Sequence, residues 1–253
     1  MMIVDADSHL TLTENPSQTV EQLIANMDRA RIQKSIIWLQ PPYMRDLEEA
    51  NRYVYESARK FPDRLLPVGW VDPHFGMKQS MAMLRTCLDE YGMLGVKLNG
   101  AQNSFYIDNP ELDPLYEEIE KRDKILALHI GADFYDFTHP YRAGHIAERH
   151  PNLRMLLAHM GGAGVPDLGL ACMDMAEAHP NMLLIGSAIN HKRVLEAVRR
   201  LGADRVCFGS DAPFYYQHVE VAAYQALLKD DLSPEDYALV MGQNILRFLR
   251  LDC

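Results

Sequence analysis

ILALHIG, residues 125–131, is an apolar run that ends in His129 and is followed by a glycine. The next such run, RMLLAHMGG at residues 154–162, has the same form and ends in His159. Short apolar runs bounded by turn residues predict buried strands, and continuous apolar runs suit a parallel sheet that is covered on both faces. We therefore expect two neighbouring parallel strands that each carry a histidine at the carboxyl end.

Six further runs of this kind occur along the chain, and the starts of successive runs lie 24 to 32 residues apart. Amphipathic helical patterns lie between them, so each interval fits one strand, one helix and two loops. Eight such units predict a (β/α)8 barrel of the α/β class. An open sheet with a dinucleotide site is disfavoured because no G-x-G-x-x-G follows the first run. The expected strands are residues 3–7, 35–39, 65–71, 95–98, 125–129, 154–159, 182–186 and 206–209.

The size and charge of the chain limit its domain count and its partners. A barrel of this kind takes about 250 residues, so the 253 residues predict one domain over 1–253. The formal net charge of −10 disfavours nucleic acid and membrane surfaces as partners. No apolar run or leader pattern indicates a membrane span or a signal peptide. The four cysteines lack metal-site spacing, which predicts reduced thiols in a cytoplasmic protein.

The first strand carries three polar residues at alternating positions. Asp5, Asp7 and His9 are expected to share a face, because alternate side chains of a strand point the same way. In a barrel that face is the interior, where uncompensated polar groups are costly. A divalent cation would compensate them. The alternative is that the two aspartates cap a turn and the histidine lies at the surface.

A further aspartate, Asp211, follows the last strand in FGSDAP, residues 208–213. Considered singly, Asp211 could be a helix cap, and His129 and His159 could be ordinary core histidines. Together with Asp7 and His9, these residues lie at the ends of strands 1, 5, 6 and 8. The carboxyl ends of those strands surround one mouth of a barrel. Carboxylate and imidazole groups are ligands for divalent metals. We therefore expect a metal site at this mouth.

This arrangement resembles the amidohydrolase superfamily, and within it the amidohydrolase-2 branch. That branch includes aminocarboxymuconate-semialdehyde decarboxylase, resorcylate-type decarboxylases and lactone hydrolases. The similar segments span nearly the whole chain. They are IVDADSH (3–9), WVDP (70–73), GVKL (95–98), ALHIG (127–131), LAHMGG (157–162), FGSDAP (208–213) and GQNILRFL (242–249).

The resemblance implies a role for each matching residue. His159 and Asp211 would be catalytic, with His159 positioning water or contacting the substrate, and Asp5 would support the first ligands. The implied cofactor is one divalent metal ion, zinc or manganese. Its implied ligands are Asp7, His9, His129 and Asp211.

Asp7 departs from the usual family pattern, which has H-x-H on the first strand, although some decarboxylases have glutamate there. Two carboxylates with two neutral imidazoles would neutralise a 2+ ion. The added oxygen ligand shifts the preference from zinc towards manganese or magnesium. This departure leaves open the identity of the metal and whether Asp7 binds it directly.

Substrate contacts are expected from Lys97, Asn99 and Arg45, which lie at strand ends or in the loops beyond them. Lys97 could instead be a carboxylated lysine between two metals, but a salt-bridged or substrate-facing lysine is favoured. The loops beyond the strands are rich in aromatic residues. They indicate either a planar substrate or the surface of a homodimer.

The expected function is a metal-dependent hydrolase that directs metal-activated water at an ester, lactone or amide, with Asp211 as general base. The first alternative is a non-oxidative decarboxylase of a small carboxylic or aromatic acid. The acid at position 7 favours that alternative, and the short chain opposes it. The second alternative is a metal-free barrel that acts as a binding protein. For an enzyme, the partner is a small-molecule substrate.

Overall fold

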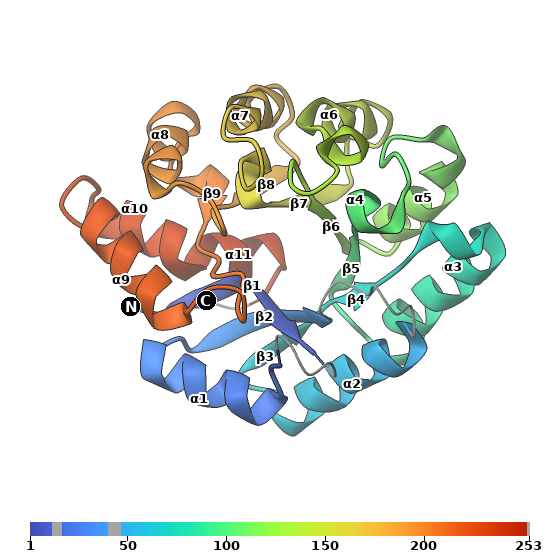
Figure 1. Ribbon diagram of the computed structural model, residues 1–253, viewed down its shortest axis with the longest axis horizontal. Coiled ribbons are helices and arrows are strands. Elements are labelled where there is room, and N and C mark those ends of the chain that lie inside the picture. Colours follow the sequence, from blue (N-terminus) through green and yellow to red (C-terminus); the bar gives the residue numbers. More distant parts are fainter. Residues whose placement is uncertain (12–16, 40–46, 252–253) are drawn as a thin grey trace.

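The computed structural model describes residues 1–11, 17–39 and 47–251. Its centre is a set of parallel strands surrounded by helices (Figure 1). The strands agree closely with the eight expected runs, except that the third is divided into β3 and β4 at Val68. They are β1 Val4–Leu10, β2 Lys34–Leu39, β3 Leu65–Pro67, β4 Gly69–Trp70, β5 Gly95–Leu98, β6 Ile125–His129, β7 Arg154–Ala158, β8 Met182–Ile185 and β9 Val206–Cys207.

Apart from β3, which continues into β4, each strand is followed in the chain by helical structure. The α-helices are α1 Val20–Ala30, α2 Leu47–Lys60, α3 Met77–Arg85, α4 Gly100–Asn103, α5 Asp113–Lys121, α6 Pro140–Arg149, α7 Leu168–Ala178, α8 His191–Leu201, α9 Gln217–Leu228, α10 Pro234–Ala238 and α11 Asn244–Phe248. The shorter 3-10 and π segments are η1 Pro73–Phe75, η2 Thr86–Glu90, η3 Pro110–Leu112, η4 Tyr135–Thr138, η5 His159–Gly161, η6 Ala203–Arg205 and η7 Leu239–Gln243.

Backbone hydrogen bonds join the strands into a ring. The ladders run in the order β1-β2-β3 and β4 to β9, and all pairs are parallel. The Val68 N–H donates to the carbonyl of Ile37 at 2.9 Å and links the two ladders. At the other junction, the Ala6 N–H donates to the carbonyl of Phe208 at 3.0 Å, and the Asp211 N–H donates to that of Asp7 at 2.8 Å. The predicted (β/α)8 barrel is confirmed.

The apolar core has two parts, one inside the barrel and one between the strands and the helices. Val4 and Ala6 of β1 belong to the inner part, together with residues of α11 such as Ile245 and Leu246. Helix α11 therefore closes the floor of the barrel. The opposite end, where the strands reach their carboxyl termini, holds the polar residues.

Strand β1 contains a β-bulge between Asp5 and Ser8, where β1 has one residue more than β2. A bulge of this kind interrupts the alternation of side chains along a strand. As a result Asp7 follows Ala6 into the barrel interior, whereas Asp5 faces α9 and accepts a hydrogen bond from Nε2 of Gln217 at 2.8 Å. The expectation that Asp5 shares the inward face of Asp7 is therefore wrong.

The expected helices are present, with differences at three places. Helix α3 continues into the π segment η2, and η7 separates α10 from α11. Near that division Gly242 passes the chain start so closely that a Cβ would lie 2.8 Å from the Met2 carbonyl oxygen. Helix α4 was not expected.

Two further expectations concern the cysteines and the membrane. Within the described residues, no helix has both the length and the apolar character that crossing a membrane requires. Cys87, Cys172 and Cys207 are buried free thiols. Burial raises the pKa of the Cys87 and Cys172 thiols to about 12, which makes both unreactive at neutral pH.

Candidate metal centre

Asp7, His9 and Asp211 come together at the carboxyl ends of β1 and β9. Each offers one ligand atom, and these atoms all lie within 4.8 Å of one another. Nε2 of His9 is 3.4 Å from Oδ1 of Asp7 and 3.2 Å from Oδ1 of Asp211. Two carboxylates and one imidazole on buried or nearly buried side chains fit one divalent metal ion.

The ring of His9 is oriented by its neighbours on β2. Nδ1 donates to the carbonyl of Leu39 at 2.9 Å, so Nε2 is the nitrogen that faces the carboxylates. The indole N–H of Trp38 lies 3.2 Å from that Nε2. Burial opposes a charge on the ring, yet hydrogen bonds to the two carboxylates raise the pKa of His9. A metal and a proton would therefore compete for Nε2.

Asp7 is fully buried and ionised. Burial alone would raise its pKa, but the positive charge of Lys97 and the neighbouring His9 ring hold the pKa of Asp7 well below its ordinary value. Nζ of Lys97 is 3.8 Å from Oδ1. The other oxygen, Oδ2, accepts a hydrogen bond from Ser187 at 2.6 Å. Oδ1 has no hydrogen-bond partner within the described residues, so it is the atom available to a cation.

His129 and His159 lie side by side, and Nδ1 of His159 is 3.7 Å from Oδ2 of Asp7. His129 Nδ1 is 3.2 Å from Nε2 of His159. Burial lowers the pKa of His129 to about 4, so the ring is neutral at physiological pH. Its Nε2 is buried and lies 3.5 Å from Oδ2 of Asp133. His129 is not part of the group whose ligand atoms all lie within 4.8 Å of one another, which is formed by Asp7, His9 and Asp211. Its role as fourth ligand stays a prediction.

Lys97 lies at the end of β5 between two indole rings. Nζ is 3.8 Å from the ring centre of Trp38 and 5.6 Å from that of Trp70. Burial lowers the pKa of Lys97, and the carboxylates of Asp7 and Asp211 oppose that shift. Indole faces attract cations and would repel the anion of a carboxylated lysine. This environment favours an ammonium group over the carboxylated alternative.

The other two expected substrate contacts differ in what the structure describes. Asn99 is buried and caps α4, with Oδ1 accepting from the Gln102 N–H at 3.2 Å. Its Nδ2 has no hydrogen-bond partner within the described ranges. Arg45 lies outside the described residues.

Several buried polar atoms at this end of the barrel lack hydrogen-bond partners in the described part of the chain, and four of them belong to residues proposed for the site. Leaving such an atom unpaired costs about 1–3 kcal/mol, so a group of them marks a place where a ligand would supply the missing partners. Two are acceptors suited to a cation, and two are donors suited to an anion. They are Asp7 Oδ1, His129 Nε2, Lys97 Nζ and Asn99 Nδ2.

Asp5 connects the two segments that carry the clustered aspartates. Its carboxylate accepts from the Asp7 N–H at 3.1 Å and from the Ser210 N–H at 2.9 Å, beside the chain turn that holds Asp211. It also accepts from Ser210 Oγ at 2.6 Å. Burial raises the pKa of Asp5 to about 6, although these hydrogen bonds favour the charged form. This position agrees with the expected supporting role.

Sequence reasoning missed two neighbours of the site. Ser187 contacts both Asp7 and His159, and Trp38 contacts His9. A third neighbour, Phe214, is one of the aromatic loop residues, and its ring lies 5.6 Å from the ring of His9 at 82°. Ser187 follows β8, which corresponds to the seventh expected strand. A polar residue directly after that strand was the signal that could have indicated Ser187. Small polar residues are common after strands, which makes that signal weak.

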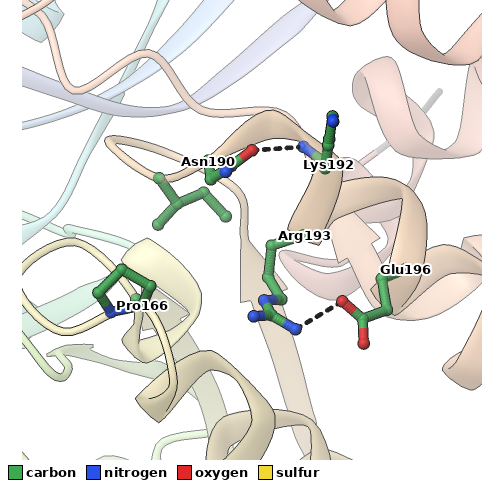
Figure 2. A pocket seen from close by; sticks show the side chains of 7 residues that line it. Pro166, Asn190, Lys192, Arg193 and Glu196 are labelled. Carbon is green, nitrogen blue, oxygen red and sulfur yellow. Dashed lines mark hydrogen bonds and ion pairs between the residues drawn. The ribbon is translucent and has the colours of Figure 1, made fainter.

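A separate hollow of about 240 Å³ lies between the chain after β7 and the start of α8 (Figure 2). Asn190 accepts from the Lys192 N–H at 3.1 Å, and Arg193 pairs with Glu196 at 2.5 Å. Three of its polar side chains are thus engaged with one another or with the helix start. Its lining residues are Gly162, Pro166, Ile189, Asn190, Lys192, Arg193 and Glu196.

A closed barrel with two carboxylates and a histidine at its mouth is the architecture of a metal-dependent barrel enzyme. The sequence profile of the amidohydrolase family matches residues 43–251. The chain therefore belongs to the amidohydrolase family, as its motifs indicated.

The curated relatives that it resembles include two decarboxylases. It is 25% identical to 2-amino-3-carboxymuconate-6-semialdehyde decarboxylase of Dictyostelium discoideum, over 85% of this chain and 69% of that protein. It is 26% identical to gamma-resorcylate decarboxylase of Rhodococcus jostii, over 74% of this chain and 75% of that protein.

Two solved structures share the fold. That of 2,6-dihydroxybenzoate decarboxylase from Rhizobium has a TM-score of 0.84 at 20% identity and covers 100% of both chains. That of dihydroxybenzoic acid decarboxylase from Polaromonas has a TM-score of 0.80 at 16% identity, over 98% of this chain and 97% of that one. The latter contains manganese and an inhibitor, 2-nitroresorcinol.

These relatives correct the expected reaction. The expectation of a hydrolase that directs water at an ester, lactone or amide is wrong, because the similar enzymes named above are decarboxylases. The metal site alone could not distinguish the two, since one cation can polarise a carbonyl or hold a carboxylate.

Proposed function

We propose that this protein is a metal-dependent, non-oxidative decarboxylase of a small aromatic carboxylic acid. The observation that carries the proposal is a set of buried atoms without hydrogen-bond partners in the described residues at one end of the barrel, some suited to a cation and some to an anion. The relatives of this chain are decarboxylases. A hydroxylated aromatic acid offers both a carboxylate for the donors and oxygen atoms for a metal.

The proposed metal ligands are the three clustered residues and His129. Two carboxylates among four ligands favour manganese over zinc. When bound, the ion would supply a positive charge that holds the oxygen atoms of the substrate and stabilises negative charge on it. The proposed ligands are Asp7, His9, His129 and Asp211.

The charges of the site suit an anionic substrate. Asp7 and Asp211 contribute two negative charges, and Lys97 contributes one positive charge beside Asp7. With a divalent ion the sum is one positive charge, which a monoanionic carboxylic acid would neutralise. Nζ of Lys97 and Nδ2 of Asn99 are buried donors without a hydrogen-bond partner in the described residues, and we assign them the substrate carboxylate.

The reaction breaks the bond between the ring carbon and the carboxylate. Carbon dioxide leaves, the electron pair stays on the ring carbon, and one proton must be added there. Asp211 and His159 are the proposed catalytic residues, and one of them delivers that proton. Asp211 is the more accessible, with a side chain 12% exposed. It can therefore take up a new proton from water after each turnover.

Three further proposals complete the functional description. The catalytic unit comprises residues 1–253, as the length of the barrel suggests. The exposed aromatic side chains Phe134, Tyr135, Tyr215 and Tyr216 support pairing of two copies as a homodimer. The buried free cysteines suit the cytoplasm.

The test is carbon dioxide release from a panel of hydroxybenzoates, with the metal content measured on the same sample. In D2O, the product should carry one deuterium at the carbon that lost the carboxylate. Asp211→Asn should reduce the rate by at least about 100-fold, whereas Asp230→Asn, at an exposed aspartate between α9 and α10, should not. Failure of a manganese-loaded sample on the whole panel would refute the proposed reaction. A protein that binds no metal would support the binding-protein alternative instead.

A further inference from the structure

A chain of four buried side chains connects two of the proposed metal ligands across the mouth of the barrel. Ser187 Oγ lies 2.6 Å from Oδ2 of Asp7 and 3.1 Å from Nδ1 of His159. Nε2 of His159 lies 3.2 Å from Nδ1 of His129. None of the four residues is more than 7% exposed. The positions of the hydrogens along this chain decide which atoms remain free for a ligand.

The Asp7 end fixes the direction of the chain. A carboxylate can only accept, so the single hydroxyl hydrogen of Ser187 points to Asp7. Nζ of Lys97 lies 3.8 Å from the other oxygen, Oδ1, and its positive charge compensates the buried carboxylate. Ser187 Oγ then offers only lone pairs to His159. The backbone carbonyl of Ser187, 3.3 Å from the same Nδ1, also only accepts. Nδ1 of His159 must therefore carry the hydrogen.

The direction continues to His129. A neutral imidazole has one N–H, so Nε2 of His159 is an acceptor and Nδ1 of His129 donates to it. That leaves a lone pair on Nε2 of His129, the atom that a metal would use. The reverse arrangement would place a hydrogen on this Nε2, which the Asp133 carboxylate at 3.5 Å favours but which would leave no lone pair there for a metal. It would also leave two acceptors, Ser187 Oγ and Asp7 Oδ2, facing each other at 2.6 Å.

We propose that Ser187 is a positioning residue that transmits the hydrogen-bond direction of Asp7 to His129. It holds Oδ2 of Asp7, which turns Oδ1 towards the cation, and it keeps the lone pair of His129 Nε2 available. This inference rests on the metal site of the proposed function. It does not depend on the reaction.

The first experiment observes the hydrogens directly in metal-free protein. Long-range ¹H–¹⁵N spectra of ¹⁵N-histidine-labelled protein distinguish the two tautomers, and His129→Gln assigns the signal. We expect His129 to carry its hydrogen on Nδ1. Ser187→Ala should abolish this preference, and Ser187→Thr should restore it. Ser57→Ala, which also removes a buried serine hydroxyl but in α2, should leave it unchanged.

Asp7→Asn should produce the opposite tautomer of His129. An asparagine amide can donate to Ser187 Oγ, which frees the serine hydrogen for Nδ1 of His159 and reverses the chain. His129 should then carry its hydrogen on Nε2. A wild-type protein with the Nε2–H form of His129 would overturn the inference, and so would an Asp7→Asn protein that retains the Nδ1–H form.

The second experiment measures manganese affinity through quenching of tryptophan fluorescence, because Trp38 and Trp70, the two tryptophans of the chain, flank the site. Loss of a residue that orients metal ligands typically weakens metal binding about 10- to 100-fold. We expect that loss in Ser187→Ala, recovery in Ser187→Thr and no change in Ser57→Ala. Unchanged affinity in Ser187→Ala would refute the positioning role. Failure of the wild type to bind manganese would instead refute the proposed metal site, while the tautomer measurement still tests the chain.

Discussion

Replacing Lys97 with methionine should make the metal-free protein less stable and make added manganese more stabilising. Nζ of Lys97 is 3.8 Å from Oδ1 of Asp7, and the two side chains are 1% and 0% exposed. Removing one partner of a buried ion pair costs about 3–5 kcal/mol, because the other charge stays buried without compensation. Two unit charges about 4 Å apart attract by about 4 kcal/mol at an effective dielectric constant near 20, which agrees with that range. Methionine preserves the apolar length of the side chain.

Manganese should return part of this stability. The ion supplies positive charge beside Asp7, and the substitution removes a cation that opposes its binding. The increase in the free energy of unfolding on adding manganese should therefore be larger in Lys97→Met than in the wild type, at equal free metal concentration.

The assay is urea unfolding at pH 7, with chelator or with manganese. Lys78→Met in α3, at an exposed lysine, serves as the matched control and should behave as the wild type in both conditions. Equal metal-free stability of Lys97→Met and wild type would refute the buried ion pair. Equal stabilisation by manganese would refute the placement of the metal beside Asp7.

Three other predictions concern the frame of the site, a partly buried ion pair and the cofactor. Asn51→Ala should lower the free energy of unfolding by about 1–3 kcal/mol, because it removes the buried hydrogen bonds of 2.8 and 2.9 Å to the Trp70 N–H and carbonyl; an unchanged urea midpoint would contradict this. The hydrogen bond to Glu220 raises the pKa of His191, so Glu220→Gln should lower that pKa in an NMR titration. The wild type should be more stable than Glu220→Gln, and the difference in the free energy of unfolding should be largest below about pH 6.5. This difference should disappear as the pH rises through the raised pKa of His191. Chelation should abolish carbon dioxide release, and manganese should restore it; activity that survives complete metal removal would exclude a metal-dependent reaction.

The strands were predictable because a barrel buries both faces of each strand. Such strands are continuous apolar runs, and the run at 125–129 coincides with β6. The bulge in β1 was not predictable, because Asp5-Ala6-Asp7 reads as regular alternation whether or not a residue is inserted. Helix α4, which Asn99 caps, has only four residues. A helix of that length is too short to leave a periodic signal in the sequence.

The site was predictable only in part. Asp7, His9 and Asp211 are charged or titratable residues at strand ends, and the structure does bring them together. Ser187 and Trp38 act through hydrogen bonds to those residues, and neither position shows a pattern along the chain. The reaction was mispredicted because hydrolysis and decarboxylation can use the same ligands, so the choice between them depends on substrate contacts in loops of irregular sequence.

The bulge in β1 also affects how this barrel can evolve. Val4, before the bulge, and Ala6, within it, fill the interior core, where a change of volume is destabilising. Asp7, the next residue, contacts Ser187 and Lys97 instead. A mutation of this one codon among histidine, glutamate and aspartate would alter the charge of the metal centre while the core keeps its residues. The first strand can thus diverge in chemistry and stay constrained in structure, with the inserted residue as the boundary between the two.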